Sequence, residues 1–176
     1  MSKRTVLSSD DIRRAITRIS HEILEQNRGL ENLLLLGIPT RGVQLANRVA
    51  KVIQDHSESQ VSVGSIDVTM FRDDLADQPT RIVGSTNIPS TGVTGKNVVL
   101  IDDVLFSGRT VRAGLDALIE HGRPAAVRLA VLIDRGHRQL PIRADYVGKN
   151  LPTAMTERIS VKLNEIDGLD EVVIED

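Results

Sequence analysis

Two adjacent carboxylates, Asp102 and Asp103, follow a run of four apolar residues in the segment VVLIDDVLFSGRTV, residues 98–111. The apolar run predicts a buried strand, and the two aspartates stand at its carboxyl end. Carboxylates repel phosphate but bind sugar hydroxyls and hydrated Mg²⁺. The pair therefore indicates a site for a polyol, a metal ion, or both. A strand followed by an Asp-rich turn remains the alternative for an isolated pair.

The turn after the aspartates suits a phosphate group. It leads into a predicted helix at residues 108–121, and the unpaired N–H groups of a helix N-terminus attract anions. Gly108 permits a close approach of the backbone, while Ser107 and Thr110 add hydroxyl donors. A phosphorylated ribose would satisfy both the turn and the neighbouring carboxylates.

A second glycine-rich turn, GIPTRG at residues 37–42, also joins a buried strand to a helix. By itself this pattern is a weak signal, because glycine turns after strands are common. Beside the first turn it gains weight as another anion site. Thr40 and Arg41 are its candidate ligands, since an arginine fork with backbone donors suits a phosphate group.

Strands alternating with helices predict an α/β fold with a mostly parallel sheet covered by helices on both faces. The first helix is expected to be capped by Ser8 or Ser9, with Asp10 and Asp11 in its first turn. The other expected elements are strands at 33–37, 97–102 and 126–133, a β-rich run at 61–69, helices at 43–55 and 108–121, and short strands in ADYVG and ISVKL.

Composition narrows the possible classes of protein. The chain has 176 residues, a net charge of −2 and no cysteine, so we expect one domain over residues 1–176 without disulfides or thiolate metal sites. It has no signal-like or membrane-spanning segment, which predicts a cytoplasmic protein with no membrane partner. Two phenylalanines, one tyrosine and no tryptophan argue against a base-stacking surface.

The segment at residues 98–111 resembles the 5-phosphoribosyl-1-pyrophosphate (PRPP) motif of type I phosphoribosyltransferases. The resemblance implies the type I phosphoribosyltransferase fold, with a small base-binding hood at about 134–163. It also implies that Asp102 and Asp103 hold the ribose hydroxyls, with Mg²⁺ bound through PRPP nearby. Thr40 and Arg41 would bind pyrophosphate, and a mobile loop at about 70–90 would close the site. The residues implied for the 5′-phosphate turn and the closing loop are Val104, Leu105, Phe106, Ser107, Gly108, Arg109, Thr110, Arg72 and Arg81.

The base is expected to be uracil. Purine-using members of the superfamily usually carry an aspartate four residues after the first acidic one, where this chain has Phe106, which cannot take a proton. Residues 132–153 resemble the bifunctional pyrimidine operon regulators that are also uracil phosphoribosyltransferases, and residues 11–23 and 68–75 match them too. The implied reaction is uracil plus PRPP giving UMP and pyrophosphate, with Arg135 and the neighbourhood of Ile159 forming the base pocket.

Basic and hydroxyl side chains exceed what one enzyme pocket requires, which suggests a polyanionic partner. In the resembled family this partner is the leader mRNA of pyrimidine genes, and uridine nucleotides (UMP or UTP) promote binding. The candidates are Arg14, Thr17, Arg18 and His21 on the first helix, with His137, Arg138, Arg143 and Lys149 further on. We expect a homodimer or higher homo-oligomer. The alternatives are a solvated helix face on a purely metabolic salvage enzyme, and an RNA regulator that keeps its pocket only as a nucleotide sensor.

Overall fold

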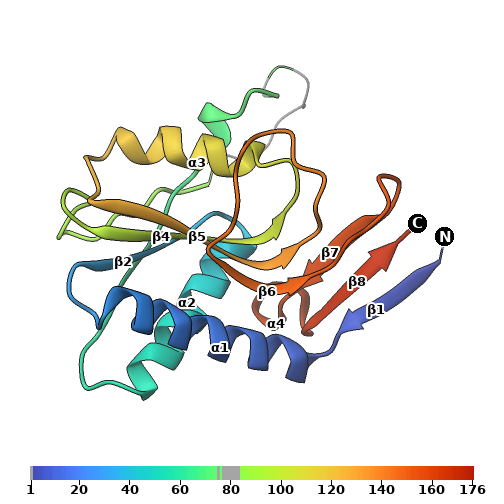
Figure 1. Cartoon of the computed structure of the whole chain (residues 1–176), viewed down its shortest axis with the longest axis horizontal. Helices are drawn as coiled ribbons and strands as arrows, with labels where there is room; N and C mark the ends of the chain where they lie inside the picture. Colours follow the sequence, from blue (N-terminus) through green and yellow to red (C-terminus); the bar gives the residue numbers. More distant parts are fainter. Residues whose placement is uncertain (1, 75, 77–83) are drawn as a thin grey trace.

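The computed structural model describes residues 2–74, 76 and 84–176. Its centre is a five-stranded parallel sheet in the order β3-β2-β4-β5-β6 (Figure 1). This sheet confirms the predicted α/β fold and the strands expected at 33–37 and 126–133. The strands are β2 (Leu33–Gly37), β3 (Ser62–Ser65), β4 (Asn97–Leu105), β5 (Ala126–Asp134) and β6 (Tyr146–Asn150).

Strand β4 continues beyond the predicted end at residue 102. Val104 and Leu105 pair with Ile133 and Asp134 of β5, and the Leu105 side chain is buried in the core. The acidic pair therefore lies within the last part of the strand instead of after it. This extension flanks the acidic pair with paired residues, since Asp102 pairs with Val131 and Val104 with Ile133.

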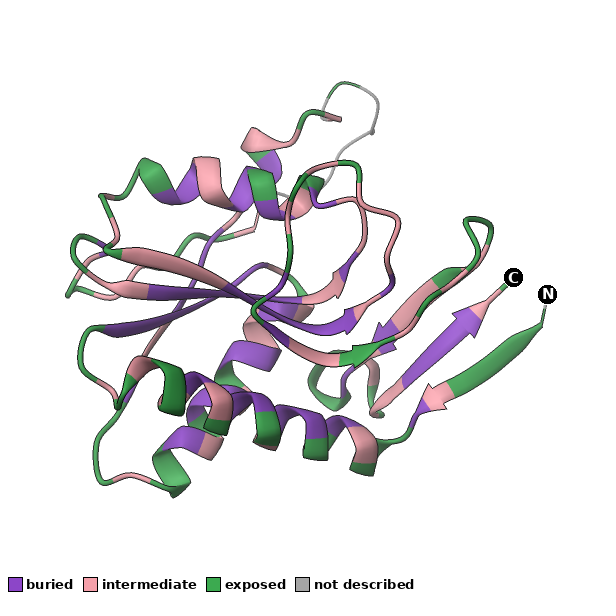
Figure 2. Ribbon diagram, in the orientation of Figure 1, coloured by how far each residue is buried: buried purple, intermediate pink, exposed green. Residues whose placement is uncertain are grey.

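Helices cover both faces of the sheet (Figure 1). Helices α1 (Ser9–Asn27) and α2 (Arg41–Asp55) lie on one face, and α3 (Arg109–Ile119) lies on the other. Along β2, Leu33 and Leu35 pack with α1 and α2, whereas Leu34 and Leu36 pack with α3. Successive strand residues face opposite sides of a sheet, so a strand between two helical layers requires an uninterrupted apolar run. Strand β2 has such a run and is buried along its whole length (Figure 2).

Helix α1 begins where its capping residues predict. The Ser8 hydroxyl accepts the N–H of Asp11 at 3.3 Å, and the Asp11 carboxylate accepts the N–H of Ser8 at 2.9 Å. This reciprocal capping box selects Ser8 over Ser9 as the cap. The Ser8 hydrogen bonds also lower the pKa of Asp11 to about 2.

A second sheet, antiparallel and in the order β1-β8-β7, joins the two ends of the chain. It consists of β1 (Lys3–Leu7), β7 (Arg158–Lys162) and β8 (Glu171–Glu175), and the β7–β8 connection contains the short helix α4 (Asn164–Asp167). The segment ISVKL does form a strand, β7. Strand β1 is not evident from the sequence, because its exposed residues KRT show no apolar alternation.

Between β3 and β4 the chain forms less strand than expected. The β-rich run at 61–69 contains only β3, and a 3₁₀ turn, η1 (Thr69–Phe71), follows. The expected mobile loop at 70–90 falls partly outside the described residues, and so does Arg81. Both the loop's mobility and the hood at 134–163 stay predictions. No helix among the described residues is long and apolar enough to cross a membrane.

Candidate functional site

A cavity of about 740 Å³ opens at the carboxyl ends of β2, β3 and β4. In parallel sheets ligands bind at this edge. The cavity brings together three segments that are far apart in sequence. They are residues 38–41 after β2, residues 67–69 after β3, and residues 102–104 in β4, with Arg72 and Thr110 beside them.

The two carboxylates of β4 both line this cavity, but their environments differ. The Asp102 side chain is only 7% exposed and accepts the N–H of Asp103 at 2.9 Å. Asp103 is half-buried and accepts the N–H of Val104 at 2.8 Å. Burial, reinforced by the charge of Asp103, raises the pKa of Asp102 well above its usual value. The ionised form of Asp102 is thus disfavoured in the structure, and a cationic ligand between the two carboxylates would favour it.

The donor set fits Mg²⁺ delivered with a substrate. Carboxylate oxygens are the ligands that Mg²⁺ prefers, and it commonly takes one or two of them together with substrate phosphates and water. Among the described residues no group of three or more His, Cys, Asp or Glu side chains could hold a metal alone. Asp102 and Asp103 would therefore share the ion with the substrate.

The turn after β4 has the geometry expected of a phosphate site. Gly108 is the N-cap of α3 in a left-handed conformation, with φ of 92°, which favours glycine. The Ser107 hydroxyl accepts the N–H of Arg109 at 3.3 Å, and its carbonyl accepts two N–H groups from residues 139 and 140. The turn is consequently pre-shaped, whereas the buried Leu105 side chain faces the core and leaves only its backbone for ligand contacts.

Two glycines place the second turn against the acidic pair. A Cβ on Gly42 would lie 2.4 Å from the Ile101 carbonyl oxygen, and one on Gly37 would lie 2.4 Å from the Gly42 carbonyl oxygen. Only glycine allows α2 to begin so close to β4, one residue before Asp102. Thr40 and Arg41 consequently face the same cavity as the aspartates, and the Pro39–Thr40 peptide bond is cis.

Arg72 already lies at the cavity wall. Its guanidinium donates to both Asp74 oxygens at 2.8 Å and to the Thr110 hydroxyl at 2.9 Å. Asp73, the next residue, pairs with Arg109. The start of the loop is thereby attached to the first turn of α3, next to the phosphate turn.

Of the residues predicted for the base pocket, Arg135 lies against Phe106. The Arg135 guanidinium lies 4.2 Å from the centroid of the Phe106 ring, and His137 meets the same ring edge-on at 6.2 Å. Arg135 is buried and donates to the Thr153 hydroxyl at 3.0 Å and to the Glu157 carbonyl at 2.9 Å. Ile159 lies on β7, two residues beyond Glu157, and packs at the margin of the core.

The candidate RNA contacts on α1 do not all point the same way. Arg18 reaches across to β6 and donates to the Gly148 carbonyl at 2.6 Å. Arg14 is exposed and pairs with Asp11, while His21 meets the ring of His56, the residue after α2, at 4.7 Å. Thr17 donates its hydroxyl to the carbonyl of Arg13 within the helix.

The later set is also dispersed. Lys149 is exposed on β6, one residue after the Gly148 carbonyl that Arg18 contacts, and Arg143 is exposed on a loop. His137 is half-buried and donates to the Thr153 carbonyl. Arg138 points inward and bonds three carbonyls and Asp134. Arg14, Arg18 and Lys149, termed the α1–β6 strip below, are exposed candidates on α1 and on the strand that Arg18 contacts, although Arg18 also pairs with Glu22.

Two acidic residues of this region are not evident from the sequence. Asp67 lines the cavity after β3 and accepts the Thr69 N–H and hydroxyl, at 3.2 and 2.8 Å. The end of the β-rich run could have pointed to it. Asp167 contacts Arg41 at 2.8 Å, and no local pattern signals that contact because 126 positions separate the two residues.

The acidic pair of β4 and the loop of Thr40 and Arg41 share one cavity at the carboxyl edge of a parallel sheet, with the glycine turn of α3 beside it. The chain matches the phosphoribosyl transferase domain family over residues 4–166, and it belongs to that family. The fold is similar to the hypoxanthine phosphoribosyltransferase of Trypanosoma cruzi, with a TM-score of 0.72, 18% identity, and coverage of 97% of this chain and 95% of that one.

Within this family, the chain has high sequence identity to proteins of one subgroup. It is 61% identical to the "Bifunctional protein PyrR" of Leifsonia xyli subsp. xyli, covering 100% of this chain and 98% of that protein. It is 58% identical to the protein of that name from Streptomyces coelicolor, covering 97% and 89%. These relatives confirm the resemblance to the bifunctional pyrimidine regulators that residues 132–153 indicate.

Proposed function

We propose that this chain transfers the phosphoribosyl group of PRPP to uracil, giving UMP and pyrophosphate, and regulates pyrimidine genes in response to uridine nucleotides. The observation that carries the enzymatic part is the shared cavity of the acidic pair and the loop of Thr40 and Arg41, with the phosphate turn beside it. A substrate with a sugar diol, a 5′-phosphate and a pyrophosphate needs these three kinds of site together.

Each site has a distinct task in the proposed reaction. Asp102 and Asp103 hold the ribose hydroxyls and stabilise the positive charge that grows on the sugar as its bond to pyrophosphate breaks. The backbone N–H groups from Ser107 to Thr110 hold the 5′-phosphate. Arg41, Thr40 and Arg72 bind the leaving pyrophosphate, and we assign Arg81 to the same group. Mg²⁺, when bound with PRPP, supplies positive charge beside the aspartates.

The base pocket follows from Phe106 and Arg135. Phe106 offers no proton acceptor, which favours a pyrimidine over hypoxanthine. Arg135 packs over its ring and ties the pocket to residues 153–157. Backbone groups around Ile159 and in this loop are suited to read the imide edge of uracil, which presents two acceptors and one donor.

The regulatory part rests on the α1–β6 strip. Its three basic side chains lie outside the cavity, where catalysis does not use them. We assign them to phosphates of the leader mRNA of pyrimidine genes, with Arg143, Thr17, His21 and His137 as neighbouring contacts. One subunit offers only a narrow strip, which favours a homodimer or higher homo-oligomer acting in the cytoplasm.

Two measurements test this proposal. Turnover with PRPP should occur with uracil and not with hypoxanthine, and use of both bases at similar rates would contradict the assignment of Phe106. Filter binding of pyrimidine leader RNA should tighten when UMP is added. Uracil turnover without such binding would leave a purely metabolic salvage enzyme, whereas binding without turnover would leave a nucleotide sensor.

A further inference from the structure

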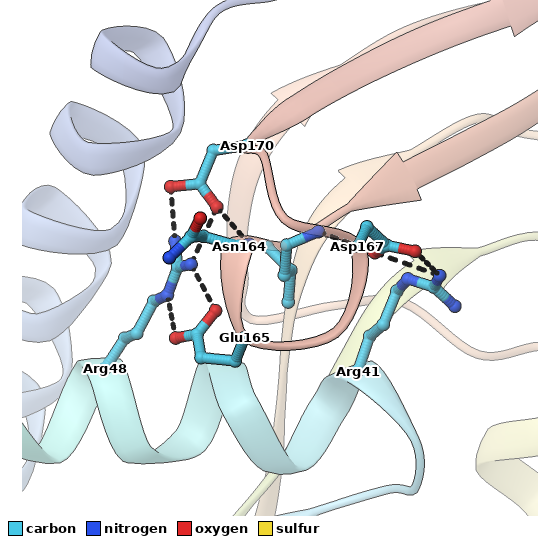
Figure 3. A network of polar contacts seen from close by, with 7 residues as sticks. Arg41, Arg48, Asn164, Glu165, Asp167 and Asp170 are labelled. Carbon is cyan, nitrogen blue, oxygen red and sulfur yellow. Dashed lines mark hydrogen bonds and ion pairs between the residues drawn. The ribbon is translucent and has the colours of Figure 1, made fainter.

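Arg41 is held at the cavity wall by a carboxylate from a distant part of the chain (Figure 3). Its Nη2 donates to both oxygens of Asp167, at 2.8 and 3.1 Å. Arg41 is the first residue of α2, and Asp167 ends α4 in the connection between β7 and β8. The Arg41 side chain is 31% exposed, and its buried Nε has no hydrogen-bond partner among the described residues. One part of the guanidinium is therefore anchored, while another donor remains unsatisfied.

Asp167 is itself fixed in place. One of its oxygens accepts the N–H of Leu163 at 2.8 Å. That hydrogen bond, with a smaller contribution from Arg41, lowers the pKa of Asp167, so this carboxyl group is ionised at neutral pH. It presents a constant negative charge to Arg41.

A second arginine attaches the same connection to α2 (Figure 3). Arg48 donates to both oxygens of Glu165, at 2.7 and 2.5 Å, and to both oxygens of Asp170, at 3.1 and 2.7 Å. This clamp does not involve Asp167. The connection can consequently stay on α2 when the contact between Arg41 and Asp167 opens.

We propose that Asp167 is a positioning residue that holds Arg41 at the cavity wall and releases it to the pyrophosphate group. Phosphate oxygens and a carboxylate are equivalent acceptors for a guanidinium, so the two compete for the same donors. Pyrophosphate must displace Asp167 from Arg41, and this displacement lowers the net binding free energy of pyrophosphate. Pyrophosphate is therefore bound less tightly and is released more readily as product. This inference rests on the proposed function, because it assumes that pyrophosphate occupies the loop of Thr40 and Arg41.

The test measures binding of inorganic pyrophosphate with Mg²⁺ to the full-length protein by calorimetry, without uracil. Asp167→Asn keeps an oxygen for the Leu163 N–H but removes the charge. We expect it to tighten pyrophosphate binding roughly two- to fivefold, the range for a partly exposed ion pair. Asp167→Glu keeps the charge and should bind pyrophosphate about as wild type does. Asp167→Ser serves as a second neutral variant if the asparagine variant is unstable.

Glu165→Gln is the matched control. It removes one negative charge two residues away, from the clamp of Arg48, and should lower thermal stability without changing pyrophosphate affinity. If both Glu165→Gln and Asp167→Asn bound pyrophosphate more tightly to the same extent, the change in net charge would explain the effect. That result would overturn the inference. Arg41→Gln completes a double-mutant cycle, because in that background Asp167→Asn should have no further effect.

The outcomes separate the inference from the proposed function. If the wild-type protein binds pyrophosphate but Asp167→Asn leaves its affinity unchanged or weaker, the role of Asp167 is wrong and the enzymatic proposal stands. If the wild-type protein binds no pyrophosphate in the presence of Mg²⁺, the assignment of the loop at residues 37–42 fails, and the inference fails with it.

Discussion

Arg138 donates to the carbonyl oxygen of Phe106 at 2.9 Å, which ties the segment after β5 to the phosphate turn after β4. The same guanidinium bonds the Ile142 carbonyl at 2.9 Å and pairs with Asp134. The turn after β4 and residues 134–142 are therefore one connected unit. A side chain so engaged has few donors left for an external phosphate.

Replacing Arg138 should accordingly damage the enzyme. Arg138→Ala leaves the half-buried carboxylate of Asp134 and several carbonyls without their donor, which we expect to cost about 1–3 kcal/mol of folding free energy. The KM for PRPP should rise, because the phosphate turn loses its support. Thermal melting and steady-state kinetics measure both effects, with Lys149→Ala as the exposed basic control. Loss of RNA binding alone, with stability and KM intact, would instead make Arg138 an RNA contact.

Asp103→Asn should nearly abolish turnover while the fold survives. The amide keeps the shape of the side chain but removes the charge needed beside the cationic sugar and its metal ion. We expect a loss of roughly 10²-fold or more in kcat, as for other removed electrostatic stabilisers. The assay uses saturating Mg²⁺ and both substrates, with circular dichroism to check folding. Near-wild-type activity would exclude the assigned role.

Asp102→Asn should stabilise the fold at neutral pH. Burial raises the folded-state pKa of Asp102 above the ordinary 3.8, so above that value the folded protein retains a proton that the unfolded chain releases. The contribution of Asp102 to the free energy of unfolding is therefore greatest below its pKa in the unfolded chain. It is lost as the pH rises through its pKa in the folded protein. Without Mg²⁺, we expect a higher Tm for the variant at pH 8 by a few degrees, with a smaller difference at pH 4. A Tm gain independent of pH would contradict this cause.

Arg18→Ala together with Lys149→Ala should weaken RNA binding and leave uracil turnover almost intact. Both residues belong to the α1–β6 strip, away from the cavity. The affinity of wild type should fall with salt at a log–log slope of about −0.7 to −0.9 per neutralised phosphate, and each lost contact should flatten the slope by roughly one unit. RNA titrations over a range of salt concentrations measure this. Unchanged slopes would show that the strip is only a solvated surface.

Short-range patterns in the sequence were sufficient for most strands of the central sheet and for the turns that follow β2 and β4. The apolar run at 33–37 is buried on both sides, and Ser8 caps the first helix. The glycine turn at Gly108 lies where the strand-to-helix pattern indicates, and Asp102 and Asp103 lie near the end of the predicted strand, which continues to Leu105. These features depend on hydrogen bonds and side-chain faces within a few residues, so their signal is contained in the local sequence.

The tertiary structure alone decided which distant groups meet. Arg41 is paired with Asp167, Arg138 is turned inward to Phe106, and the unpredicted strand β1 is completed by β8 from the opposite end of the chain. A charged side chain has the same local pattern whether it faces solvent, an RNA or an internal carbonyl. Its partner is selected only when compaction brings a complementary group within hydrogen-bonding distance, and that selection leaves no periodic trace in the sequence.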